Sequence, residues 1–158
     1  MQERGYCDVE VITTGCVVAP KGFKAGTTYC GIKIAKDSLD LGIIFSEYPA
    51  TGAALFTTNQ IYAAPVGLSK KIIQKGCVRA FIINSGNANA CTGEQGYKDA
   101  GEMLRIAAKC LKISADELLV ASTGIIGRPL LMDKIAAGIK TAAASLGNAP
   151  EHGNAMAR

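Results

Sequence analysis

The sequence predicts an α+β fold in which a sheet comes first in the chain and two main helices follow. Short β-forming segments with period-two alternation occupy much of the first 60 residues. After residue 90, apolar residues instead recur at spacings of three and four, which is typical of amphipathic helices. With 158 residues, 49% of them hydrophobic, the chain can bury a core. We therefore expect a layered α/β sandwich, with residues 1–158 forming one domain that is incomplete at its C-terminal end.

The first part of the chain is expected to form an antiparallel meander. Residues 30–36 alternate apolar with polar side chains, which predicts a strand with one buried face. Pro49 and Gly52 mark a turn between two further β-rich segments. The predicted strands are residues 9–12, 16–19, 30–36, 39–46 and 53–58.

The middle of the chain combines short elements. Residues 65–69 are interpreted as a short strand, and residues 70–74 as a short helix that Gly76 ends. Residues 78–83 are almost entirely apolar, which predicts a strand buried on both faces.

Two amphipathic helices are predicted in the second half. The first covers residues 93–111, and Thr92 with Gln95 fits a capping box at its start. Its apolar stripe is Tyr97, Ala100, Leu104, Ala107 and Leu111. The second covers residues 132–146 and is expected to end at Gly147.

Between and after these helices the pattern changes twice. Ser114 opens a second capping box, which predicts one helical turn followed by a buried strand over residues 118–122. Residues 151–158 resemble the first turn of another helix.

Composition and charge argue against several classes of protein. The apolar runs are far shorter than the roughly 20 residues that span a bilayer, and we see no secretory signal, so we expect a cytoplasmic protein without a membrane segment. The 17 basic residues are scattered and aromatic residues make up 6%, which is unlike a nucleic-acid-binding surface. Six cysteines without a C-x-x-C pair, with a single histidine, argue against a metal site and favour buried free thiols. No cofactor is expected.

Residues 84–93 are unusually rich in small and polar side chains. They read Asn-Ser-Gly-Asn-Ala-Asn-Ala-Cys-Thr-Gly and follow a predicted buried strand. An asparagine side chain is both a hydrogen-bond donor and an acceptor. The three asparagines can therefore bind a polar ligand or satisfy backbone groups of the loop itself, and residue type alone favours the structural role.

Thr123 and Gly124 follow the next predicted strand. A glycine lets backbone N–H groups approach a ligand oxygen closely, and a threonine hydroxyl adds a directional donor. Such a pair can form an oxyanion hole, which stabilises the negative oxygen of a tetrahedral intermediate. The competing interpretation is an ordinary strand-to-helix turn, and residue type alone favours it.

Several segments carry a resemblance to a known family. They are Ala-Pro-Val at residues 64–66, the asparagine-rich residues 84–93, Val-Ala-Ser-Thr-Gly-Ile-Ile-Gly at 120–127 and Met-Asp-Lys-Ile at 132–135. In order and spacing they resemble the ornithine acetyltransferase family, also called glutamate N-acetyltransferase. Residues 20–23 and 56–59 share the likeness, which covers almost the whole chain.

The resemblance implies that this is the amino-terminal, or alpha-chain, part of such an enzyme. The family transfers an acetyl group from N-acetylornithine to glutamate in a ping-pong reaction of arginine biosynthesis, and some members also accept acetyl-CoA. A precursor cleaves itself before a threonine, which becomes the nucleophile of a second, beta chain. Two alpha and two beta chains then form a heterotetramer. Thr123 and Gly124 match the family's oxyanion-hole pair.

The family's nucleophilic threonine lies beyond Arg158, the last residue of this chain. His152, the single histidine, is not expected to be catalytic. We therefore expect the chain to need a beta chain and to be inactive alone. Two further interpretations stay open. One is a related self-cleaving amidase or aminopeptidase, because acyl transfer to water passes through the same kind of intermediate. The other is a non-catalytic binding or assembly fragment.

Overall fold

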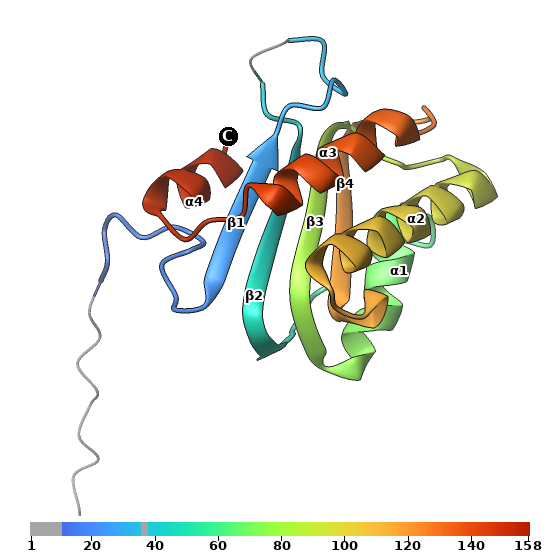
Figure 1. Ribbon diagram of the computed structural model, residues 1–158. Coiled ribbons are helices and arrows are strands. Elements are labelled where there is room, and N and C mark those ends of the chain that lie inside the picture. The colour runs from blue at the N-terminus through green and yellow to red at the C-terminus, as the bar shows by residue number, and fades with distance from the viewer. Residues whose placement is uncertain (1–10, 36–37) are drawn as a thin grey trace, which may run out of the picture.

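Four strands form a sheet in the order β1-β2-β3-β4 (Figure 1). The computed structural model describes residues 11–35 and 38–158. The strands are β1 (Phe23–Thr28), β2 (Leu41–Thr51), β3 (Cys77–Asn87) and β4 (Leu118–Ile125). β2 pairs antiparallel with both β1 and β3, whereas β3 and β4 are parallel. A parallel pair needs a crossover connection, and a helix provides it here.

In the described residues, four helices pack against this sheet. They are α1 (Ala64–Ile72), α2 (Gly93–Leu111), α3 (Met132–Ala144) and α4 (Pro150–Met156), with short 3₁₀ turns η1 (Ile73–Lys75) and η2 (Ala115–Glu117). α2 and α3 lie across the same face of the sheet, α1 lies beside β4, and α4 lies beside β1 (Figure 1). α2 is the crossover between β3 and β4.

The main core lies between the sheet and the layer formed by α2 and α3. Because strand side chains alternate between faces, every second residue of β3 and β4 enters this core. The fully or almost fully buried members include Ile82, Leu118, Val120, Met103, Ile135 and Ile139. Burying each of these large side chains stabilises the fold by about 1.5–3 kcal/mol, so this layer holds the two parallel strands in place.

The predicted α+β fold class is confirmed, but the helices alternate with the later strands, since α1 precedes β3 and β4 lies between α2 and α3. The helix at 93–111 matches its prediction, and α3 begins as predicted but ends at Ala144. Gly147, the expected helix stop, instead exchanges backbone hydrogen bonds with Ala25 of β1. The strands predicted at 39–46, 78–83 and 118–122 are all present; each extends further toward its C-terminal end than predicted, and the first begins at Leu41 rather than at residue 39.

One capping prediction is confirmed and the other is wrong. Ser114 accepts from the backbone of Asp116, and Glu117 reaches back to the Ser114 backbone, which completes a capping box. At α2, by contrast, the Thr92 hydroxyl donates to Asn89 and the Gln95 amide donates to Asp99. Both side chains therefore have partners other than the free N–H groups of the helix.

Several predicted strands are wrong. Within the described residues, 11–12, 16–19 and 53–58 contain turns or irregular backbone, and residues 9–10 lie outside the described part. In the strand predicted at 30–36, residues 30–35 form a loop around a buried carboxylate, so their alternation does not reflect a sheet face, and residue 36 lies outside the described part. The observed first strand, β1, was not predicted, because its sequence Phe-Lys-Ala-Gly-Thr-Thr contains few strongly β-forming residues.

The strand predicted at 65–69 is also wrong, because these residues belong to α1. Pro65 sits in the first turn of this helix, where a missing N–H costs nothing. The helix continues through η1 and ends at Gly76, whose φ of 76° is the left-handed conformation predicted for a helix stop.

α1 covers the outer edge of β4. The Ser69 hydroxyl donates to the carbonyl of Val120 at 2.9 Å and accepts from the N–H of the same residue at 3.1 Å. One side chain thus takes the place of a neighbouring strand for one residue of β4. Covering an edge strand in this way removes a template for pairing with another chain.

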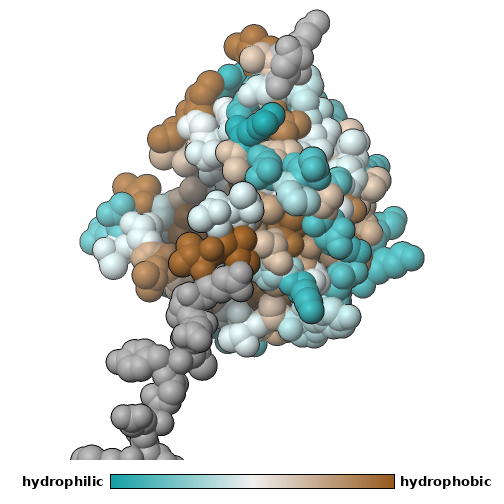
Figure 2. All heavy atoms as spheres, turned by 90° about the vertical axis from the view of Figure 1, so that its left-hand side faces the viewer, coloured by the Kyte–Doolittle hydropathy of each residue, from teal (hydrophilic) through white to brown (hydrophobic). Residues whose placement is uncertain are grey.

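The two sides of the molecule differ in polarity. Figure 2 looks from the side of β1 and α4, with the helical layer to the right, where hydrophilic side chains gather, while more apolar side chains are visible to the left. The sheet face away from α2 and α3 carries Ile44, Phe81 and Ile83, which are half-buried. Phe81 and Ile83 are therefore less enclosed than the two-sided burial predicted for residues 78–83. Across the part of the chain that the structure describes, no helix is long and apolar enough to cross a membrane.

Candidate active site

The two polar segments singled out in the sequence lie side by side at the ends of β3 and β4. The strands run parallel here, with Asn84 opposite Ser122, Ser85 opposite Thr123 and Gly86 opposite Gly124. Each segment was predicted to follow a strand, and in the structure these two strands are neighbours. The carboxyl ends of parallel strands are a common location for ligand sites in α/β proteins.

The three asparagines of the first segment bond within the protein. Asn84 donates to the carbonyl of Asn87 at 2.8 Å, and Asn87 donates to the carbonyl of Pro129 at 2.9 Å. Asn89 donates to the carbonyl of Gly96 at 2.9 Å and accepts from Thr92 at 2.8 Å. This network ties the end of β3 to α2 and to the loop before α3, which is the structural role favoured from the sequence.

Two buried polar atoms in this region have no hydrogen-bond partner among the described residues. They are Oδ1 of Asn84 and Oγ of Ser122. These residues are opposite each other in the ladder, and both belong to the sheet face that α2 covers. The two core-facing side chains beside the exposed end of β4 are therefore polar.

Gly86 and Gly124 allow the two strand ends to approach very closely. A Cβ atom at Gly124 would collide with the backbone of Gly86 and lie 2.6 Å from the nitrogen of Asn87. Both glycines also have positive φ values, 104° at Gly86 and 126° at Gly124, which L side chains rarely adopt. Glycine is thus required at Gly124 for two independent reasons.

Thr123 and Gly124 are both exposed. Because Asn84 and Ser122 face the helical layer, alternation directs Thr123 to the opposite face, together with its register partner Ser85. The hydroxyl of Thr123 therefore belongs to the open side of the sheet rather than to the core. The oxyanion-hole role assigned to this pair stays a prediction at this point.

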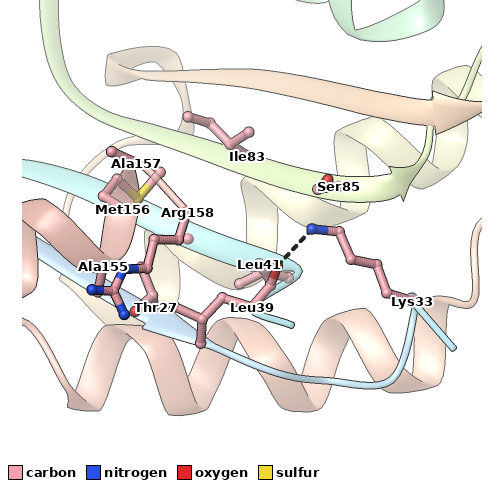
Figure 3. A pocket seen from close by; sticks show the side chains of 11 residues that line it. Thr27, Lys33, Leu39, Leu41, Ile83, Ser85, Ala155, Met156, Ala157 and Arg158 are labelled. Atoms are coloured by element: carbon pink, nitrogen blue, oxygen red, sulfur yellow. Dashed lines mark hydrogen bonds between the residues drawn. The ribbon is translucent and has the colours of Figure 1, made fainter. Parts of the chain in front are cut away.

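A cleft of about 190 Å³ lies on the same side of the sheet (Figure 3). Ser85 and Ile83 of β3 line it, and Lys33 and Arg158 contribute cationic side chains. Lys33 Nζ donates to the carbonyl of Leu39 at 2.9 Å, so its amine is held at one end of the cleft. Because Ser85 is opposite Thr123 in the ladder, the cleft approaches the predicted oxyanion hole from the β3 side.

Asp40, just before β2, is a feature that the sequence analysis missed. Its side chain is 1% exposed, and its carboxylate accepts hydrogen bonds from four consecutive backbone N–H groups, those of residues 30–33. Burial alone would raise the pKa of Asp40, but the hydrogen bonds from this loop outweigh it, so the pKa lies below its ordinary value. The signal available in the sequence was an acidic residue directly preceding a strongly apolar strand.

Cys30 lies beside this carboxylate. Burial, followed by the hydrogen bond to Asp40 and its negative charge, raises the pKa of the Cys30 thiol to about 12. The thiol therefore stays protonated at neutral pH and is not an activated nucleophile. His152, the one histidine, packs against Gly147 at the start of α4, away from the strand ends. In residues 11–35 and 38–158, no cluster of three or more metal-ligating side chains occurs.

The chain has an α+β fold, and its two parallel strands end in polar and glycine residues, of which Thr123 and Gly124 are exposed. It is a member of the ArgJ family, whose model matches residues 24–158. The bifunctional arginine-biosynthesis protein ArgJ of Caldanaerobacter subterraneus subsp. tengcongensis is 49% identical over 135 residues, which are 85% of this chain and 33% of that protein. The ArgJ protein of Dehalococcoides mccartyi is 42% identical over 149 residues, or 94% of this chain and 37% of that protein.

Two solved structures share the fold closely. The ArgJ protein of Bacillus halodurans and the ornithine acetyltransferase of Mycobacterium tuberculosis, the latter crystallised with ornithine, each superpose with a TM-score of 0.86 at 39% identity. Each match covers 91% of this chain and 74% or 77% of the solved chain. The chain spans about a third of the length of the curated relatives it matches.

Proposed function

We propose that this chain forms part of an ornithine acetyltransferase that moves an acetyl group from N-acetylornithine to glutamate in arginine biosynthesis. Membership of the ArgJ family supports the proposal, as does the similarity to an ornithine acetyltransferase crystallised with ornithine. In this proposal a threonine nucleophile comes from the remaining part of the enzyme, a beta chain, and two alpha and two beta chains assemble. Acetyl-CoA is a second candidate acetyl donor.

Within that reaction, we assign Thr123 and Gly124 to the oxyanion hole. Attack on the acetyl carbonyl turns its oxygen into an alkoxide, which needs donors already in position. The observation that carries this assignment is that both residues are exposed at the end of β4. Close backbone contact between Gly86 and Gly124 holds this end of β4 against β3. A donor on a strand end fixed by close backbone contact does not need to reorganise when charge develops.

The test combines residues 1–158 with the remaining part of an ArgJ protein by co-expression. The assay follows ornithine release from N-acetylornithine in the presence of glutamate. We expect Thr123→Ala to lower kcat by about 100- to 1000-fold, the usual effect of removing one oxyanion donor. The matched control is Thr141→Ala, which removes an exposed hydroxyl on α3 whose partner is its own helix, and should leave kcat unchanged.

Two results would contradict the proposal in different ways. A Thr123→Ala enzyme with normal kcat would remove Thr123 from the oxyanion hole. Acetate release from N-acetylornithine at the same rate with and without glutamate would instead identify a hydrolase, because the acetyl group would then pass to water.

A further inference from the structure

The carboxylate of Asp40 organises a loop that is separate from the strand ends described above. Its Oδ1 accepts from the N–H of Cys30 at 2.7 Å, and its Oδ2 accepts from Gly31, Ile32 and Lys33 at 3.0, 2.7 and 3.1 Å. Four converging N–H groups form a concave anion-binding arrangement of the backbone. Here the anion is a side chain of the protein itself, so the loop is wrapped around a fixed internal charge.

The backbone of Asp40 is also hydrogen-bonded to two strands of the sheet. Its N–H donates to the carbonyl of Thr28 at 3.1 Å, at the end of β1. Its carbonyl accepts from the N–H of Ser85 at 2.8 Å, and Ser85 is the register partner of Thr123. One residue therefore links β1, the loop of residues 30–33 and the end of β3.

The loop that Asp40 holds rests directly on Gly86. A Cβ atom at Gly86 would lie 3.0 Å from the Lys33 side chain and 3.1 Å from the Ile32 side chain. On its other side, the backbone of Gly86 is in close contact with Gly124. A continuous series of contacts thus runs from the Asp40 carboxylate through the loop and Gly86 to Gly124.

We propose that Asp40 is a positioning residue for acetyl transfer: it presses the loop of residues 30–33 against Gly86 and so fixes the strand ends that present Thr123 and Gly124. This inference rests on the proposed function. An aspartate suits the task better than an asparagine, because both carboxylate oxygens accept hydrogen bonds whereas an amide would direct its NH₂ group at one of the four N–H donors. Loosening the loop displaces the oxyanion donors without removing either of them.

The experiment uses the co-expressed complete enzyme and measures kcat and KM separately. We expect Asp40→Asn to lower kcat by roughly 100-fold, the order of effect of a 1 Å misplacement in an active site, and to leave KM within about twofold. Ile32→Ala keeps the carboxylate and every backbone donor but removes one of the two side chains that cover Gly86. It should lower kcat by about tenfold and serves as a second test if Asp40→Asn folds poorly.

A destabilised control separates positioning from general loss of stability. Ile139→Ala removes a fully buried side chain from α3, on the other side of the sheet from the open cleft. Assayed at a temperature at which circular dichroism shows every variant folded, it should keep kcat within about twofold of the wild type, because it leaves the contacts at Gly86 intact.

A double-mutant cycle with Thr123→Ala supplies the decisive readout. If Asp40 acts through the oxyanion donors, the loss of kcat in the double variant should be at least about tenfold smaller than the product of the two single losses, since residues that act as a unit are not additive. Fully multiplicative effects, or an Asp40→Asn enzyme that behaves like Ile139→Ala, would overturn this inference while leaving the proposed function in place. A Thr123→Ala enzyme with normal kcat would overturn the assignment of Thr123 to the oxyanion hole, and this inference with it, whereas acetate release that does not depend on glutamate would overturn the proposed acetyl transfer.

Discussion

Asp40 carries a buried charge that is balanced by backbone N–H groups rather than by a cation. Hydrogen bonds to a charged group contribute about 1.5–3 kcal/mol each, so the carboxylate matters for stability as well as for the loop. Because its pKa in the folded chain lies below the unfolded value of about 3.9, the contribution is fully present above that pH. It is lost as the pH falls through the lower, folded pKa.

The lowered pKa of Asp40 predicts a specific pH dependence for the stability of Asp40→Asn. At pH 7 the variant should be less stable than the wild type by about 2–3 kcal/mol, and the gap should narrow as the pH falls below about 4. Urea unfolding at pH 7, 5 and 3 measures the free energy of unfolding of both proteins. A gap that stays constant down to pH 3 would show that the charge of Asp40 does not contribute.

Gly124 allows a prediction with a matched control in the same segment. A methyl group at Gly124 would collide with the backbone of β3 and would also require a residue with a side chain to adopt a φ of 126°. Gly127 has a positive φ of 77° as well, but a methyl group there would meet nothing within 4 Å. We expect Gly124→Ala to cost about 3 kcal/mol and Gly127→Ala about 1 kcal/mol of stability.

Thermal or urea unfolding of the two glycine variants provides the measurement. Equal losses would mean that backbone conformation alone explains the requirement for glycine. The contact between β3 and β4 would then carry no part of it.

At the scale of single elements, α1 shows why a short apolar segment can be predicted as a strand and still form a helix. Residues 65–69 fit a strand by composition, and a run of five residues cannot distinguish the two periods. Pro65 in the first helical turn and the contact of Ser69 with β4 explain why the helix forms. The second fact involves a residue 51 positions away, so it is invisible to local patterns.

The same contact predicts the effect of Ser69→Ala. This change leaves a buried N–H and carbonyl of Val120 without their side-chain partner, which should cost about 1–3 kcal/mol. Ser145→Ala is a suitable control, because the Ser145 hydroxyl bonds only to the last turn of its own helix in the described structure. It should cost less than about 0.5 kcal/mol. Equal free energies of unfolding for the two variants, measured in urea, would argue against a role for Ser69 at the edge of β4.

The elements that could be predicted from the sequence are those with long, regular patterns. The helix at residues 93–111 has five turns of apolar spacing, and the core of β3 is a continuous apolar run, so both were found. β1 and the loop of residues 30–35 were missed, because their conformation depends on pairing with β2 and on the buried Asp40. Period-two alternation in a loop that surrounds a carboxylate is indistinguishable from that of a strand.

The candidate site, too, could be predicted from the sequence only in part. The polar segments that contain Gly86 and Gly124 were recognised as unusual, and the family resemblance pointed to Thr123 and Gly124. Their parallel pairing was not predicted, although the strand, helix and strand expected at residues 78–83, 93–111 and 118–122 supply the crossover connection that a parallel pair needs. The role of Asp40 was also hidden, because four of its partners are backbone N–H groups, which every sequence contains.

The crossover between β3 and β4 also has a consequence for the chain while it is being made. β1, β2 and β3 can pair as soon as residue 87 has left the ribosome, but β4, the second neighbour of β3, begins only at residue 118. At a synthesis rate of about 5–20 residues per second, β3 stays an uncovered edge for roughly 2 to 6 seconds. During this interval the exposed edge of β3 can pair with another nascent chain. Once β4 pairs with β3 and α1 covers the outer edge of β4, that edge is no longer exposed.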